Sequence, residues 1–141
     1  MNAEVTFDGF EGHWDLSRKI VDHRAGNVGS FVGLAVFQRH ADEYLYEETG
    51  LLSLSGAASM TACRRYIWRR HDARVQVLFE DRRAFHEIDL STSAPEATHF
   101  CDPDTYDVAY DFSAWPRWSG HWQVRGPRKH YEMWSIHTRN T

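Results

Sequence analysis

The sequence predicts an all-β protein, an antiparallel up-and-down barrel of about ten strands. Apolar and polar residues alternate over short runs, Gly, Pro, Asn or Asp interrupts these runs at regular intervals, and helical periodicity is almost absent. The chain also has Gly12 and Trp14 near its start and Arg139 near its end. In a closed barrel the last strand can lay such an arginine across the indole. We therefore expect a structural role for Trp14 and Arg139, which close one end of the barrel.

The first five expected strands carry alternating large side chains and are separated by small or polar residues. They cover residues 12–24, 31–39, 44–54, 60–70 and 75–80. The turns between them lie at residues 25–27, 41–42, 56 and 71–72, each of which contains Gly, Asn or Asp. Within the strands, Trp14 and Leu16 share one face of the first, and Tyr66 and Trp68 share one face of the fourth.

The remaining five expected strands cover residues 85–90, 98–102, 106–112, 120–125 and 130–139. They are separated by a turn at 81–83, a loop around Pro95, a turn at 102–104, an aromatic connector at 115–118 and a turn at 126–128. Because consecutive connections are short, we expect a meander. Its closure into a barrel removes the edge strands with unpaired backbone groups that an open sheet would expose. Residues 1–10 are expected to form a short cap over one end.

Length and composition favour a single domain over residues 1–141. The net charge of −4 favours neither nucleic acid nor an anionic membrane surface. No stretch approaches the ~20 apolar residues that cross a bilayer, and the N-terminus lacks the basic region of a secretory signal, so we predict a cytoplasmic protein. Cys63 and Cys101 lack CxxC spacing and are expected to be free thiols.

One face of the alternating pattern becomes the barrel interior, and it is apolar near Trp14 and polar elsewhere. Unpaired buried polar groups each cost about 1–3 kcal/mol, so they must bond to one another, to water or to a ligand. We predict a cavity for a small polar or anionic, partly hydrophobic ligand, and keep open a hydrogen-bonded network that merely fills the barrel. The candidate ligand-binding residues are Arg18, Tyr46, Glu48, Arg64, Tyr66, His86, His99, Cys101, Tyr106, Lys129 and Tyr131. Among these, Arg18, Arg64 and Lys129 supply positive charge.

An enzyme acting on such a ligand is the first alternative, although we lean towards a protein without activity. His99 or His86 is the candidate general acid or base. Cys101 lies two residues after His99, on the same face of a strand, and could pair with it as a nucleophile. A free cysteine more often behaves as a small buried hydrophobe.

Nine histidines raise the question of a metal or haem. No pair has zincin spacing, so no metal site is predicted. His137 on the last strand is the candidate axial ligand of a haem, but a histidine held by hydrogen bonds is the commoner case, and we expect no cofactor. The aromatic and basic run at 66–70 is typical of single-stranded nucleic-acid binding, which the acidic net charge opposes. A homodimer and a purely structural interaction module stay open.

Several ordered blocks carry a family resemblance over nearly the whole chain. They are Gly12-x-Trp14, Phe31-x-Gly33-x-Ala35-x-Phe37, Tyr46-x-Glu48, Arg65-Tyr66-x-Trp68, Phe79-x-Asp81-x-Arg83-x-Phe85-His86, His99-x-Cys101-x-x-Asp104-x-Tyr106 and Gly126-Pro127-x-Lys129-x-Tyr131. Together with Arg139 they resemble the calycin superfamily of lipocalins and fatty-acid-binding proteins, and within it a family of small bacterial proteins of unknown function with a lipocalin-like barrel. The resemblance implies the fold and leaves the activity open. Barrels similar to nitrobindin carry haem on a histidine of a late strand, a position that His137 matches here.

Overall fold

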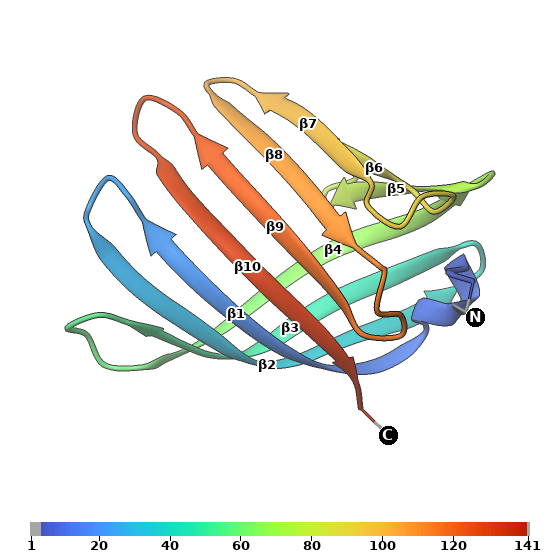
Figure 1. Ribbon diagram of the computed structural model, residues 1–141, viewed down its shortest axis with the longest axis horizontal. Helices are drawn as coiled ribbons and strands as arrows, with labels where there is room; N and C mark the ends of the chain where they lie inside the picture. Colours follow the sequence, from blue (N-terminus) through green and yellow to red (C-terminus); the bar gives the residue numbers. More distant parts are fainter. Residues whose placement is uncertain (1–3, 141) are drawn as a thin grey trace.

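The computed structural model describes residues 4–140 and contains one short 3-10 helix and ten strands (Figure 1). The elements are η1 (Phe7–Phe10), β1 (Gly12–Asp22), β2 (Asn27–His40), β3 (Glu43–Leu54), β4 (Met60–His71), β5 (Arg74–Phe79), β6 (Ala84–Asp89), β7 (Glu96–Cys101), β8 (Asp104–Asp111), β9 (Trp118–Arg125) and β10 (His130–Arg139). None of the helices in this described part is long and apolar enough to cross a membrane.

The strands form one antiparallel sheet in the order β6-β5-β4-β3-β2-β1-β10-β9-β8-β7. Consecutive strands are neighbours throughout, and pairing of β1 with β10 brings the two ends of the chain together. The predicted up-and-down barrel is therefore confirmed. Its closure is incomplete, because within residues 4–140 no hydrogen-bonded ladder joins β6 to β7. The expected removal of all strand edges is wrong at this one seam.

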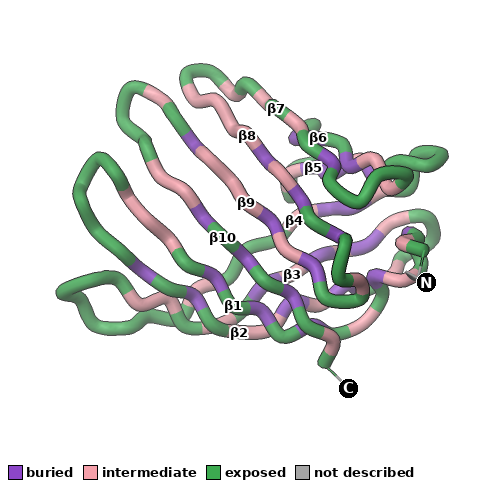
Figure 2. The backbone as a smooth tube through the Cα atoms, viewed as in Figure 1, coloured by how far each residue is buried: buried purple, intermediate pink, exposed green. Residues whose placement is uncertain are grey.

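Burial alternates along the strands as the period of two requires (Figure 2). In β1, Trp14, Leu16 and Arg18 are buried while their neighbours are exposed. An irregularity in register lies between Val77 and Leu78, where β5 pairs with β6. Both of these residues are buried, which is how a bulge locally breaks the alternation.

The closed end of the barrel is held by aromatic rings and by the last strand. Trp14 is fully buried, and its indole N–H donates to the backbone oxygen of Phe10 at 2.9 Å. The guanidinium of Arg139 lies 3.9 Å from the centre of the Trp14 ring and donates to the backbone oxygens of Gly9 and Glu11. Of the expected cap, η1 packs here through the buried ring of Phe10. Residues 1–3 of that cap lie outside the described residues.

The hairpins β1–β2, β3–β4, β7–β8 and β9–β10 lie at the opposite end, away from η1 (Figure 1). We call this end the mouth. Two glycines face each other where β2 meets β3 on the way to it, Gly33 and Gly50. A Cβ on Gly33 would lie 2.0 Å from the backbone oxygen of Thr49, and one on Gly50 would lie 2.3 Å from that of Val32. This close approach of two backbones requires glycine at both positions.

Candidate functional site

A buried ion pair lies in the middle of the barrel interior. Arg18 of β1 donates from Nη1 and Nη2 to the two carboxylate oxygens of Glu48 of β3, at 2.8 and 2.7 Å. Its Nε donates to the hydroxyl of Ser135, the residue directly opposite it on β10, at 2.7 Å. The two charged side chains are 9% and 4% exposed. The forked geometry satisfies both charges, which is the condition for placing them away from water.

Two further side chains extend this network, Tyr46 of β3 and His137 of β10. The Tyr46 hydroxyl donates to Glu48 at 2.6 Å and lies 2.8 Å from Nε2 of His137. Because the phenol proton points to Glu48, the phenol oxygen must accept the N–H of Nε2. Neutral His137 then has no proton on Nδ1, and that atom is buried without a partner. The indole of Trp118 stacks on the imidazole with ring centres 3.7 Å apart.

The network separates a charged centre from neutral surroundings. Burial acts to raise the pKa of Glu48, but the hydrogen bonds and charge of Arg18 outweigh it and hold that pKa well below its ordinary value. Burial lowers the pKa of His137 to about 3, so its imidazole is neutral at pH 7. Burial and the nearby Glu48 carboxylate raise the pKa of Tyr46. Among residues 4–140, the buried charged side chains are therefore one cation and one anion, and they are paired with each other.

A second buried hydrogen bond lies across the barrel from this network. Nε2 of His86, on β6, is 2.9 Å from the hydroxyl of Tyr110, on β8. Burial, with a smaller contribution from the charge of His99, lowers the pKa of His86 to about 3. Its Nδ1 is buried and has no partner. The His86 imidazole is therefore neutral at pH 7.

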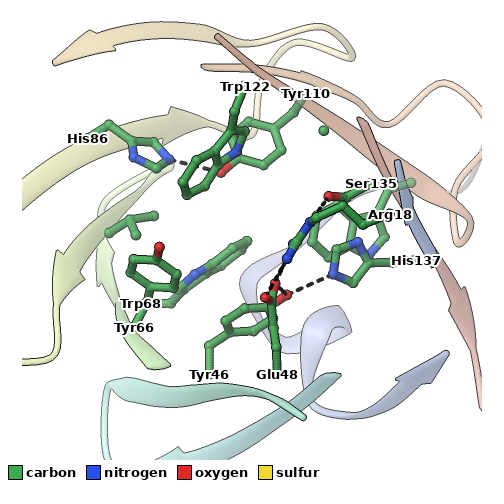
Figure 3. Close-up of a pocket in the computed structure, with 13 residues that line it drawn as sticks. Arg18, Tyr46, Glu48, Tyr66, Trp68, His86, Tyr110, Trp122, Ser135 and His137 are labelled. Atoms are coloured by element: carbon green, nitrogen blue, oxygen red, sulfur yellow. Dashed lines mark hydrogen bonds and ion pairs between the residues drawn. The ribbon is translucent and has the colours of Figure 1, made fainter. Parts of the chain in front are cut away.

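The Arg18–Glu48 network and the His86–Tyr110 pair line one inner cavity (Figure 3). Its volume is about 30 Å³, room for one or two water molecules. It is lined by Arg18, Tyr46, Glu48, Tyr66, Trp68, Val77, His86, Tyr110, Trp118, Gly120, Trp122, Ser135 and His137. Most of the interior around the ion pair is thus filled by side chains, and a drug-sized molecule needs several times this space.

An outer pocket of about 130 Å³ lies on the mouth side of the ion pair. Arg18 and Glu48 belong to both pockets. The remaining lining of the outer pocket is mostly apolar and consists of Ile20, Phe31, Leu52, Ala62, Cys63, Arg64 and Met133. Arg64 is exposed and forms no ion pair among residues 4–140. The outer pocket is therefore an apolar cup with a paired charge at its base and a cation at its rim.

The structure places the predicted site residues in four groups. Arg18, Tyr46, Glu48, Tyr66 and His86 line the inner cavity, and Arg64 lines the outer pocket. Tyr106, Lys129 and Tyr131 lie nearer the mouth, where the ammonium of Lys129 is 3.2 Å from the carboxylate of Asp104. His99 and Cys101 lie on β7, and the ring of His99 packs edge-on against Phe85 at 5.5 Å.

Arg64 connects the outer pocket to two of the predicted tyrosines. Burial raises the pKa of Tyr66 and of Tyr131, and the charge of Arg64 acts in the opposite direction on both. The guanidinium therefore lies near both phenols. His86 lines the inner cavity and Arg64 lines the outer pocket, so these two candidate residues belong to different pockets.

The chain is similar to one protein family of unknown function and to one solved structure. Residues 10–139 match the model of a family of unknown function, DUF6314. The chain belongs to this family. No curated protein matches it. A solved structure, that of the S-type phycobiliprotein lyase CPES from Guillardia theta, is similar with a TM-score of 0.66 and 11% sequence identity, covering 96% of this chain and 90% of that one. The match confirms the predicted lipocalin-like barrel.

For this DUF6314 member, Trp118 is the main interior residue that sequence reasoning missed. It was expected in the aromatic connector, but β9 begins at Trp118 and its ring stacks on His137. The signal was present, because Trp118, Gly120, Trp122 and Val124 continue one alternation. Tyr110 and Trp122 are not among the candidate ligand-binding residues, although both line the inner cavity.

The same geometry tests the haem alternative through the surroundings of His137. Its Nε2 bonds to Tyr46, and one face of its ring is covered by Trp118. An axial ligand needs a free nitrogen facing a cavity the size of a porphyrin, and the inner cavity has room for one or two waters. His137 therefore does not fit haem ligation. Among residues 4–140, no cluster of His, Cys, Asp and Glu has the geometry to hold a metal ion.

Proposed function

We propose that this protein binds a small anionic ligand with an apolar body, held in the outer pocket at the mouth of the barrel. The observation that carries the proposal is the pairing of charges inside. Arg18 is engaged by Glu48 and Ser135, whereas Arg64 at the rim has no carboxylate partner among the described residues. A ligand carboxylate or phosphate supplies the missing anion and a planar partner for the guanidinium.

The walls of the outer pocket favour a ligand that is apolar below its charged group. Phe31, Leu52 and Met133 present aromatic, aliphatic and thioether surface to it. Its volume of about 130 Å³ is close to the ~150 Å³ of an engineered protein cavity that takes up benzene. The buried part of the ligand is therefore about one aromatic ring or a short acyl chain. Tyr66 and Tyr131, near Arg64, orient the charged group.

The similar solved structure suggests two specific candidates for the binding test. It is named as a phycobiliprotein lyase, so a bilin and a phycobiliprotein should be tested as ligand and partner. A bilin combines a carboxylate with a flat conjugated body, which suits Arg64 and the apolar walls. The outer pocket has room for one of its rings, so the rest of such a ligand lies in the open mouth.

The test compares matched charged and neutral ligands by calorimetry and thermal shift. Benzoate and hexanoate are expected to bind and to raise the unfolding temperature, whereas benzamide and hexanol are not. Arg64→Ala should weaken binding about 10- to 100-fold, the range of a charged hydrogen bond. Arg65→Ala is the matched control, because Arg65 is the next residue on β4 and bonds to Glu47.

Four results distinguish the outcomes. Equal binding by the parent and by Arg64→Ala, for every ligand found, removes Arg64 from the site. If His99→Ala loses ligand binding while Arg64→Ala binds as well as the parent, the site lies on β7. If His99→Ala still binds the ligand but no longer turns it over, the enzyme alternative is favoured. Binding of the neutral analogues as tightly as the anions overturns the charge assignment.

A further inference from the structure

An apolar strip crosses the outer face of four adjacent strands. Leu51 of β3, Val32 of β2, Ser17 of β1 and Ile136 of β10 are consecutive cross-strand neighbours. The exposed fractions of the three apolar side chains are 56%, 62% and 38%. Ser17 lies between Val32 and Ile136, so the row is apolar at three of its four positions, and exposed apolar side chains grouped in this way point to an interaction site. We call this row the central row.

Two rows flank the central row, one on each side along the strands. The row towards the closed end contains Thr49, Leu34, Asp15 and Thr138, and the row towards the mouth contains Ser53, Ser30, Lys19 and Trp134. Asp15 and Lys19 lie on β1 at equal distances from Ser17, on the same outer face. The three rows thus carry one negative and one positive charge, placed symmetrically about the central row.

This placement is self-complementary under a two-fold axis. When a second copy is laid face to face with the axis running along the central row, each strand covers its own counterpart in the opposite direction. The residues of the central row then meet themselves, and the two flanking rows exchange. Asp15 of each copy faces Lys19 of the other, twice, and Leu34 faces Ser30. A self-matching patch of this kind is the requirement for an isologous dimer.

We propose that the outer face of β3-β2-β1-β10 is the interface of a homodimer, with Val32 and Ile136 at its centre and two Asp15–Lys19 pairs across it. A second copy of the chain is the occupant that this charge pattern favours. Lys19 makes no ion pair among the described residues, and its ammonium lies 5.8 Å over the ring of Trp134. Two sheets packed face to face keep their strands roughly aligned, about 10 Å apart.

The three rows supply part of the surface that a stable interface needs. Specific interfaces bury about 800 Å² on each partner, from about 20 residues. The three rows supply twelve of these, and side chains at the ends of the same strands, such as Val28, supply others. The barrel interior opens on the opposite face of these strands, so ligand binding and dimerisation are separate properties.

Sedimentation and light scattering of the full chain, from about 1 to about 200 µM, test the proposal. The parent is expected to dimerise. Asp15→Lys alone and Lys19→Asp alone each place like charges opposite one another twice, and each should weaken the dimer about 100-fold. The combined Asp15→Lys/Lys19→Asp variant restores opposite charges and should recover dimerisation. Phe100→Glu is the control, because Phe100 is 64% exposed on β7, outside the strip.

Each outcome decides the proposal. A parent that stays monomeric at about 200 µM overturns the dimer. Dimers that persist in both single charge variants, or that fail to return in the combined variant while circular dichroism shows it folded, overturn this geometry. Val32→Glu, on the axis, should separate the subunits and leave the affinity for benzoate unchanged. If benzoate binding fails while the charge swap behaves as expected, the proposed function falls and the interface stands.

Discussion

Acidification from about pH 7.5 to about pH 5 should destabilise this protein through two buried histidines. His86 and His137 are 7% and 3% exposed, and burial lowers the pKa of each from 6.5 to about 3. In the unfolded chain the same imidazoles regain a pKa of 6.5. Below pH 6.5 these histidines are therefore protonated in the unfolded state and stay neutral in the folded state. The stability that neutral histidines provide is complete above pH 6.5 and is lost as the pH falls towards 3.

The magnitude follows from the size of these shifts. Each histidine costs about 1.4 kcal/mol of unfolding free energy for each pH unit below 6.5. At pH 5 the two together cost about 4 kcal/mol, a large share of the 5–15 kcal/mol typical of a domain. Glu48 does not contribute in this window, because its lowered pKa matters only below the ordinary carboxylate range.

Urea unfolding at closely spaced pH values measures the effect. Between about pH 6 and about pH 5 the parent should lose about 2.7 kcal/mol per pH unit, and His86→Gln/His137→Asn should lose little. His71→Gln is the control, because His71 is exposed. Proton NMR of the folded parent supplies a second readout that needs no variant. If the imidazole signals of both residues titrate with midpoints near 6.5, the reasoning from burial is refuted.

Three further predictions concern the ion pair, the glycine contact and the closed end. Glu48→Leu leaves Arg18 buried without an anion and should cost about 3–5 kcal/mol in urea unfolding, whereas Arg18→Met/Glu48→Leu should cost far less. Gly33→Ala places a Cβ 2.0 Å from a backbone oxygen of β3 and should cost about 1–3 kcal/mol, while Gly120→Ala, with its nearest atom at 3.5 Å, should be nearly neutral. Arg139→Ala removes two hydrogen bonds and a cation–π contact and should cost about 2 kcal/mol in thermal unfolding; an unchanged melting temperature contradicts this.

The inward face of each strand could be predicted because side-chain direction in a strand depends on parity alone. Starting from Trp14, alternation places Arg18, Tyr46, Glu48 and His137 inside, and the structure buries all four. Strand ends were less certain, since a strand continues as long as a neighbour offers hydrogen bonds. Trp118 shows this, because its pairing with His137 on β10 extends β9 through residues that read as a connector.

Which inward residues meet could not be predicted from parity. Arg18 and Glu48 are not opposite each other in any ladder, since Arg18 faces Phe31 and Glu48 faces Ala35. They meet diagonally across β2, where the residue between these two positions is Gly33. A Cβ at Gly33 would lie 2.0 Å from the backbone oxygen of Thr49, so the close approach of β2 and β3 at this point requires glycine. The pairing thus depends on the register of three strands, which alternation does not specify.

This pairing decides where the charge of a ligand can be received. From the sequence, Arg18 and Arg64 are equivalent cations of the barrel interior. In the structure Arg18 donates all of its hydrogen bonds in this network to Glu48 and Ser135, and displacing either partner would leave a buried group unsatisfied. An incoming anion therefore gains little at Arg18 and more at Arg64, whose guanidinium has no carboxylate partner among residues 4–140. The ion pair forms a floor of no net charge under the outer pocket, and an anion is bound by Arg64 at the rim of that pocket.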